Sequence, residues 1–201
     1  MARGDGGGKH LYEPVYEVMY KQHLIDELVF SLCLGTNGGY VQIGGYNGAG
    51  HLYADGVKWT QMRDDNYYRV TLKGLSMNDH YLEGTDRYYD GFVDSGTTIS
   101  YFPHEMFNTL KTHFSDWFCP ANHFNCAGEF RQVNVAGAPE ICFSYSEELF
   151  PNGPLKYFAT FPTLKFRMTD INGEDFNFEW FPSEYLYRYR TDLYCVAAES
   201  Q

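Results

Sequence analysis

The sequence predicts a mainly β protein with two or three short helices. Three observations support this fold class: an aromatic content of 18%, several short runs in which apolar and polar residues alternate, and turns rich in Gly and Asn between those runs. Aromatic side chains are favoured in sheets, and alternation bounded by turn signals is typical of half-buried strands. In a chain of 201 residues we expect one domain over residues 11–201 after a flexible Gly-rich segment, residues 1–10.

The first elements expected are a helix and a hairpin. Pro14 suits the first turn of a helix, and apolar residues follow at near-helical spacing: Val15, Val18, Met19 and Leu24. Residues 30–34 and 40–45 then have the pattern of two short strands, joined by an Asn-Gly-Gly turn at 37–39. Residues 67–72 alternate as a third strand.

A second helix is expected from Pro103, because apolar residues follow it on one helical face: Met106, Leu110 and Phe114. Residues 163–168 alternate, and the Asn-Gly pair at 172–173 is a strong hairpin signal before a returning strand at 176–180. Between these elements, residues 125–138 are expected to form an irregular loop.

The segment with the clearest chemical meaning is Phe-Val-Asp-Ser-Gly-Thr-Thr at 92–98. It places Asp94 on a tight turn after two apolar residues. Gly96 lets the backbone approach a neighbour closely, and the hydroxyls of Thr97 and Thr98 can hold the loop by hydrogen bonds. The segment resembles the catalytic motif of pepsin-like aspartic proteases. Asp, Ser and Gly also form ordinary turns, so the motif depends on its context.

The order of motifs along residues 11–198 resembles the C-terminal lobe of this family: the hairpin at 30–45, the strand at 67–72, and the later segments 142–143, 161–166, 182–186 and Cys195. The resemblance implies a single C-terminal lobe of the pepsin-like bilobal β-barrel fold, incomplete at its C-terminus. Within the family, three segments are similar to plasmepsin V-like proteases: Phe-Ser-Leu-Cys at 30–33, Ile-Gly-Gly-Tyr at 43–46 and Pro-Ser-Glu-Tyr-Leu-Tyr at 182–187.

The resemblance implies an aspartic-type endopeptidase in which Asp94 is the second catalytic aspartate. Such enzymes use two carboxylates that share one proton and activate a water molecule. The sequence has no other Asp-Thr-Gly or Asp-Ser-Gly, so we expect the partner carboxylate from an N-terminal lobe and no activity from this chain alone. The resemblance also implies substrate contacts by Gly96, Thr97 and Thr98, with Tyr67 as a cleft wall.

Two other classes of function stay open. The lobe can be a pseudopeptidase that binds or inhibits peptides without catalysis, or a structural module recruited into a larger assembly. A homodimer with one aspartate per chain, as in retroviral proteases, is disfavoured because those chains are about half as long and lack the opening hairpin. An Asp-Thr-Gly upstream of these residues would favour the protease.

Five cysteines are present, and their odd number leaves at least one outside any internal pairing. The resemblance implies a disulfide between Cys142 and Cys195, and therefore an oxidising compartment: the lumen of the secretory pathway or the outside of the cell. No signal peptide is visible in the first residues. Cys119 and Cys126 can close a second, small ring, which leaves Cys33 free or paired outside the chain.

The same region offers a zinc alternative, since two imidazoles and two thiols occur close together: His113, Cys119, His123 and Cys126. Their spacing matches no common structural zinc motif, so we expect no metal and no cofactor.

The formal net charge of −11 argues against nucleic acid as a partner, and no run of 18 apolar residues could span a membrane. The partners expected are a peptide or protein substrate and the N-terminal lobe of the same protease. We also expect exposed apolar surface around the Asp94 turn, because one lobe alone cannot bury all of the apolar residues that flank it: Phe92, Val93, Ile99, Tyr101 and Phe102.

Overall fold

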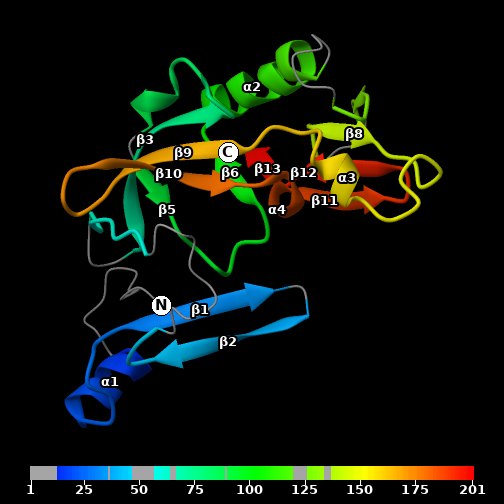
Figure 1. The fold of residues 1–201 in the computed structure, drawn as a ribbon. Coiled ribbons are helices and arrows are strands. Elements are labelled where there is room, and N and C mark those ends of the chain that lie inside the picture. The colour runs from blue at the N-terminus through cyan, green and yellow to red at the C-terminus, as the bar shows by residue number, and fades with distance from the viewer. Residues whose placement is uncertain are drawn as a thin grey trace. The chain divides into compact units, whose positions relative to one another are not determined.

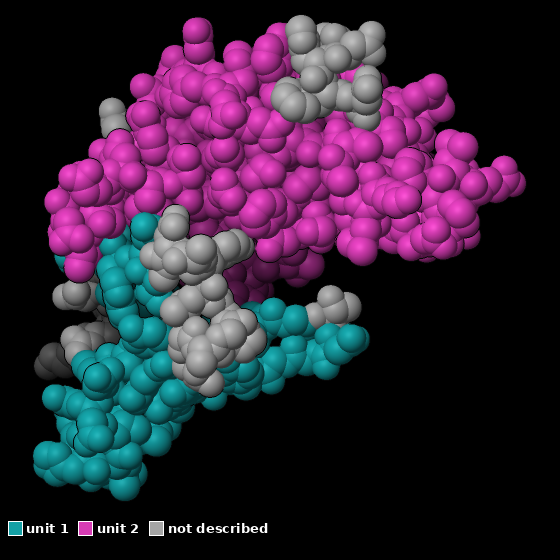
Figure 2. Space-filling model, viewed as in Figure 1, with its two compact units in different colours: residues 1–69 teal, residues 70–201 magenta. Residues whose placement is uncertain are grey.

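The computed structural model of the chain describes residues 13–35, 37–46, 57–63, 67–88, 90–119, 126–133 and 137–201. The chain forms two compact units, residues 1–69 and residues 70–201 (Figure 2). The expectation of one lobe over residues 11–201 stays a prediction.

In residues 1–69 the expected helix and hairpin are both present. Helix α1 spans Val15–Lys21 and begins directly after Pro14. Strands β1, Phe30–Gly35, and β2, Gly38–Ile43, pair antiparallel in a two-stranded sheet. At the turn end of this hairpin the strands approach so closely that a Cβ on Gly39 would lie 2.2 Å from the carbonyl oxygen of Cys33, so this position requires glycine.

Aromatic contacts connect the elements of this unit. The ring of Phe30, at the start of β1, lies 5.4 Å from that of Tyr16 in α1 and 5.9 Å from that of Tyr68. Separations of this size are typical of favourable edge-on and tilted aromatic pairs. Phe30 therefore joins the helix, the hairpin and the segment that leads into the next strand.

Residues 70–201 contain most of the strands. A five-stranded sheet has the order β10-β9-β3-β4, with β5 also paired to β3. Its members are β3, Arg69–Met77; β4, His80–Tyr81; β5, Asp90–Phe92; β9, Leu164–Thr169; and β10, Asp175–Trp180. The hairpin predicted from the Asn-Gly pair is confirmed, because β9 and β10 pair antiparallel around it. The strand expected at 67–72 begins two residues later and continues to Met77.

A four-stranded antiparallel sheet has the order β11-β12-β8-β7. Its members are β7, Phe130–Arg131; β8, Cys142–Ser144; β11, Leu186–Arg190; and β12, Leu193–Val196. Strand β7 lies inside the segment 125–138 that was expected to be irregular, so that expectation is wrong for these two residues. A last pair is parallel: β6, Ser100–Phe102, lies beside β13, Ala198–Ser200.

The helices of this unit are short. They are the 3-10 turn Thr85–Arg87; α2, His104–Thr112; α3, Leu155–Phe158; and α4, Pro182–Tyr185. Helix α2 begins after Pro103, as predicted, and continues directly as a π-helix, His113–Phe118. Figure 1 shows α2 on one side of the strands, with α3 and α4 close together on the side of β11.

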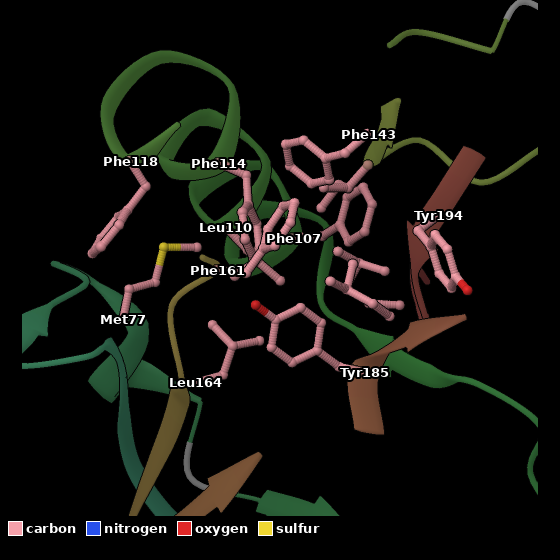
Figure 3. Close-up of a cluster of buried hydrophobic side chains, with 14 of the residues drawn as sticks. Met77, Phe107, Leu110, Phe114, Phe118, Phe143, Phe161, Leu164, Tyr185 and Tyr194 are labelled. Carbon is pink, nitrogen blue, oxygen red and sulfur yellow. The ribbon is translucent and has the colours of Figure 1, made fainter. Parts of the chain in front are cut away.

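The core of residues 70–201 forms where α2 and its π-helical extension meet the strands. Four residues three or four positions apart are fully buried on this helical face: Phe107, Leu110, Phe114 and Phe118. Figure 3 shows them directed towards side chains from β3, β9, β8 and α4. Burial of each such side chain contributes about 1.5–3 kcal/mol. This core therefore packs α2 and its π-helical extension against the strands of the unit that contains Asp94.

Candidate active site

Asp94 lies in the loop 93–99, whose two ends are strands. Strand β5 leads into the loop and is paired with β3, whereas β6 leaves it and is paired with β13. The ends of β6 are tied by backbone bonds: the N–H of Ser100 donates to the carbonyl oxygen of Ala197, and the N–H of Gln201 donates to that of Phe102, each at 2.9 Å. The loop is thus anchored by two separate sheets.

The carboxylate of Asp94 is held by its own loop. The backbone N–H of Gly96 donates to Oδ1 at 2.9 Å, and the hydroxyl of Thr97 donates to Oδ2 at 2.6 Å. The N–H of Thr97 also donates to the main-chain carbonyl of Asp94 at 3.3 Å. A Cβ on Gly96 would lie only 3.2 Å from Oδ1, so glycine leaves room for this bond. The orientation of the carboxylate is therefore fixed at both oxygens.

These two donors lower the pKa of Asp94 below its ordinary value. The bond from the Thr97 hydroxyl is the larger cause and the bond from the Gly96 N–H is the next, because both stabilise the charged form. The side chain is exposed to solvent. An oriented, exposed and ionised carboxylate can accept a proton from a bound water molecule, or share a proton with a second carboxylate.

The structure brings some of the predicted site residues together. Gly96 and Thr97 bind Asp94 directly, and Thr98 is exposed on the same loop. Tyr67 belongs to residues 1–69, lies just before β3 and is exposed. Its role as a cleft wall stays a prediction.

The apolar surface expected around the turn is present on three of the five flanking residues. Phe92, Val93 and Tyr101 are 57%, 63% and 52% exposed. Ile99 is half-buried. Phe102 is buried and stacks on Phe166 with ring centroids 6.1 Å apart. Alternation along β6 explains the difference, since adjacent residues of a strand point to opposite faces.

Sequence reasoning missed the support that β13 gives to this loop. Its residues pair with β6 in the register Ala198 to Ser100 and Ser200 to Phe102. A strand of only three residues carries almost no periodic pattern, and its partner lies 98 positions away. The one signal for β13 within its own sequence is the apolar residue Ala198, which is buried in the structure.

Four of the cysteines form two disulfides: Cys119 with Cys126, and Cys142 with Cys195. The second joins directly opposite residues of β8 and β12. Cys33 is a free, half-buried thiol. These pairs match those expected from the resemblance and from the short spacing.

The zinc alternative fails, because both thiols of that set are joined in the disulfide between Cys119 and Cys126. His123 lies outside the described residues, and the Nδ1 of His113 is 2.7 Å from the carbonyl oxygen of Thr109. Over the described ranges, no group of three or more His, Cys, Asp or Glu is placed to hold a metal ion.

Among the residues that the structure describes, no helix is long and apolar enough to cross a membrane.

Comparison with known proteins identifies a matching family model and several curated relatives. The family model described as eukaryotic aspartyl protease matches residues 6–127. A probable aspartic-type endopeptidase of Aspergillus fumigatus is 27% identical over 117 residues, which is 52% of this chain and 26% of that protein. Pepsin II-1 of Oryctolagus cuniculus is 22% identical over 143 residues, 69% of this chain and 35% of the pepsin.

Aspartic proteinase 36 of Arabidopsis thaliana is 23% identical over 179 residues, 86% of this chain and 32% of the plant protein. The chain thus spans about a quarter to a third of the length of these curated relatives.

Proposed function

The chain belongs to the eukaryotic aspartyl protease family, and from this premise we propose that it acts as part of an aspartic-type endopeptidase in which Asp94 is one of two catalytic carboxylates. The predicted pepsin-like family and mainly β fold are confirmed. The narrower likeness to plasmepsin V-like proteases stays a prediction. One observation carries the proposal: the exposed carboxylate of Asp94 is oriented at both oxygens by Gly96 and Thr97.

The proposed reaction needs a second carboxylate within about 3 Å of Asp94, so that the pair shares one proton. The ionised member takes a proton from water, and the water oxygen forms a bond to the scissile carbonyl carbon. The protonated member donates its proton to the carbonyl oxygen. When the C–N bond breaks, the leaving nitrogen takes up the proton that water released. We propose that an N-terminal lobe supplies this second carboxylate and that the chain alone is inactive.

Substrate contacts are proposed for Gly96, Thr97 and Thr98, with Tyr67 as a wall of the cleft. The Thr97 hydroxyl already donates to Asp94, so its contact with substrate would use the backbone. Thr98 can offer its hydroxyl, because it follows on the exposed part of the loop. The two disulfides support an oxidising location, the lumen of the secretory pathway or the outside of the cell.

A second candidate is a pseudopeptidase that binds peptides without cutting them. It applies if the encoded protein supplies no second carboxylate, because one carboxylate cannot act as both acid and base in the same step.

The test compares the encoded gene product with its Asp94→Asn variant, using a denatured protein as substrate at pH 4–6. We expect turnover that a transition-state inhibitor of aspartic proteases blocks, and a loss of about 100-fold or more in kcat/KM for the variant. The 201-residue chain assayed alone should give no turnover. Equal activity of the two gene products would refute the role of Asp94, whereas inhibitor binding without any turnover would identify the pseudopeptidase.

A further inference from the structure

A serine, a histidine and an asparagine form a hydrogen-bonded row at the end of β6 that lies away from the Asp94 loop. The Nδ1 of His104 is 2.9 Å from the Oγ of Ser200, and the Nε2 of the same ring is 2.9 Å from the Nδ2 of Asn108. A nucleophile beside a base, with the base held by a third group, is the arrangement that activates serine in acyl-transfer enzymes. None of the three residues belongs to the site around Asp94.

The fold brings Ser200 and His104 together although they lie 96 positions apart. Ser200 is the partner of Phe102 in the parallel pair of β13 and β6. The N–H of Gln201 donates to the carbonyl oxygen of Phe102 at 2.9 Å and so fixes this register. Figure 1 shows the C-terminal end of the chain beside β6. His104 follows Phe102 by two residues and is the first residue of α2, so the pairing holds Ser200 next to the start of the helix.

Asn108 lies four positions after His104, which places both side chains on one face of α2. Both are exposed, and Ser200 is half-buried. The carboxylate nearest in sequence, that of Glu105, has another partner, because it accepts a hydrogen bond from the hydroxyl of Tyr88 at 2.9 Å. The imidazole of His104 is therefore shared between Ser200 and Asn108, and solvent can reach it.

The direction of these two hydrogen bonds depends on the tautomer of His104 and on which atom of the Asn108 amide faces the ring. If Nδ2 faces the ring, the amide donates to Nε2, so the ring proton lies on Nδ1 and is donated to the serine. If the amide is turned over, Oδ1 accepts the proton of Nε2 and leaves Nδ1 to accept the hydroxyl proton of Ser200. The second arrangement activates the serine, and no other hydrogen bond among the described residues holds the amide in the first.

Donors for a developing negative charge lie beside the row. The first N–H groups of α2 are those of His104 and Glu105. They precede the first intrahelical bond, which the N–H of Phe107 donates to the carbonyl oxygen of Pro103 at 2.9 Å. N–H groups without an intrahelical acceptor stabilise anions at the start of a helix. They can therefore stabilise a carbonyl oxygen that becomes negative when a serine attacks it.

We propose that Ser200, His104 and Asn108 form a second reactive site, which hydrolyses small carboxylic esters through an acyl group carried on Ser200. The Oγ forms a bond to the ester carbonyl carbon while its proton passes to Nδ1 of His104. The bond from that carbon to the alcohol oxygen breaks, and the alcohol leaves with this proton. Water then attacks the acyl-serine in the same way, which releases the acid and restores the hydroxyl. Asn108 is a positioning residue, since it keeps the ring proton on Nε2.

The test uses the 201-residue chain at pH 8 with 4-nitrophenyl acetate, whose alcohol product absorbs visible light. Ser200→Ala and His104→Gln should each lower the rate of nitrophenol release about 100-fold or more, because they remove the nucleophile or its base. The matched control is Ser183→Ala, an exposed serine in α4, which should react like the parent chain. Equal rates in the parent and in Ser200→Ala overturn the proposal, as does a parent rate no higher than that of buffer.

Covalent labelling makes the test independent of how the variants fold. A fluorophosphonate reacts with activated serine hydroxyls, and peptide mass mapping of the labelled parent chain should place it on Ser200. Label on another serine, or on none, contradicts the assignment. Ester hydrolysis that is lost in His104→Gln but kept in Ser200→Ala would mean that the imidazole attacks the ester itself, which also overturns it.

Two variants of Asn108 test the tautomer. Asn108→Asp should raise the rate of acylation about tenfold, because a carboxylate can only accept the proton of Nε2 and also stabilises the imidazolium. Asn108→Leu should lower the rate about tenfold, because it leaves the tautomer unset. A merely structural asparagine would give a loss in both variants or no change in either, and each of these results would remove Asn108 from the site.

Discussion

Of the two hydrogen bonds that orient the carboxylate of Asp94, the one from the Thr97 hydroxyl is the shorter. It is also the larger cause of the lowered pKa. An aspartate whose pKa is lower in the folded than in the unfolded chain stabilises the fold above its unfolded value, about 3.9, and that contribution is lost as the pH falls through the folded pKa.

Thr97→Val should therefore raise the pKa of Asp94 towards its ordinary value and reduce the dependence of stability on pH below about 4. The change replaces a hydroxyl by a methyl group and keeps the shape of the side chain. The measurement is a carboxyl-carbon NMR titration of Asp94 in both proteins. Thr98→Val serves as the control, since it leaves the two bonds to Asp94 in place. A pKa that is the same in parent and Thr97→Val would mean that the hydroxyl does not hold the carboxylate in solution.

At the scale of elements, α2 and its π-helical extension provide the helical face of the core. Phe114 lies in the π-helix, with its ring 5.7 Å from that of Phe143 in β8 and 6.0 Å from that of Tyr185 in α4. Phe114→Ala should lower the free energy of unfolding by about 3–5 kcal/mol, because it leaves a cavity between three elements.

Urea denaturation measures this loss, with Thr112→Ala as the control. Thr112 is exposed at the end of α2, so its truncation should change the free energy of unfolding by less than about 0.5 kcal/mol. Similar values for the two variants would show that the π-helix is not packed as described.

The start of this helix could be predicted from the sequence, because Pro103 and the apolar spacing after it are local signals. The change to a π-helix at His113 could not, since the spacing of the buried residues continues at three or four. A tight turn at Asp94, held by a threonine hydroxyl, could likewise be predicted from seven consecutive residues, whereas the catalytic role of Asp94 stays a prediction. The support of this loop by β13 could not be predicted, because pairing between distant three-residue strands depends on the packing of the whole unit.

At the scale of the whole molecule, the two disulfides differ in the length of chain that they close. The bond from Cys142 to Cys195 spans 53 positions, and that from Cys119 to Cys126 spans 7. On the chain-entropy estimate, removing the first pair should cost roughly 4 kcal/mol and removing the second roughly 2.5 kcal/mol.

The measurement is chemical denaturation of the two double Cys→Ala variants beside the parent, with Cys33→Ala as the control because Cys33 is a free thiol. Equal losses from the two double variants would contradict the entropic account, as would a large loss from the control.

The pairing of β6 with β13 also has a consequence for the order in which the molecule is made. The Asp94 loop leaves the ribosome about 100 residues before the strand that lies beside β6. At about 5–20 residues per second, on the order of 5–20 s pass in which β6 has no parallel neighbour. During this time the loop lacks one of its two strand anchors, whereas the bonds from Gly96 and Thr97 to Asp94 lie within the loop and can form as soon as it is made.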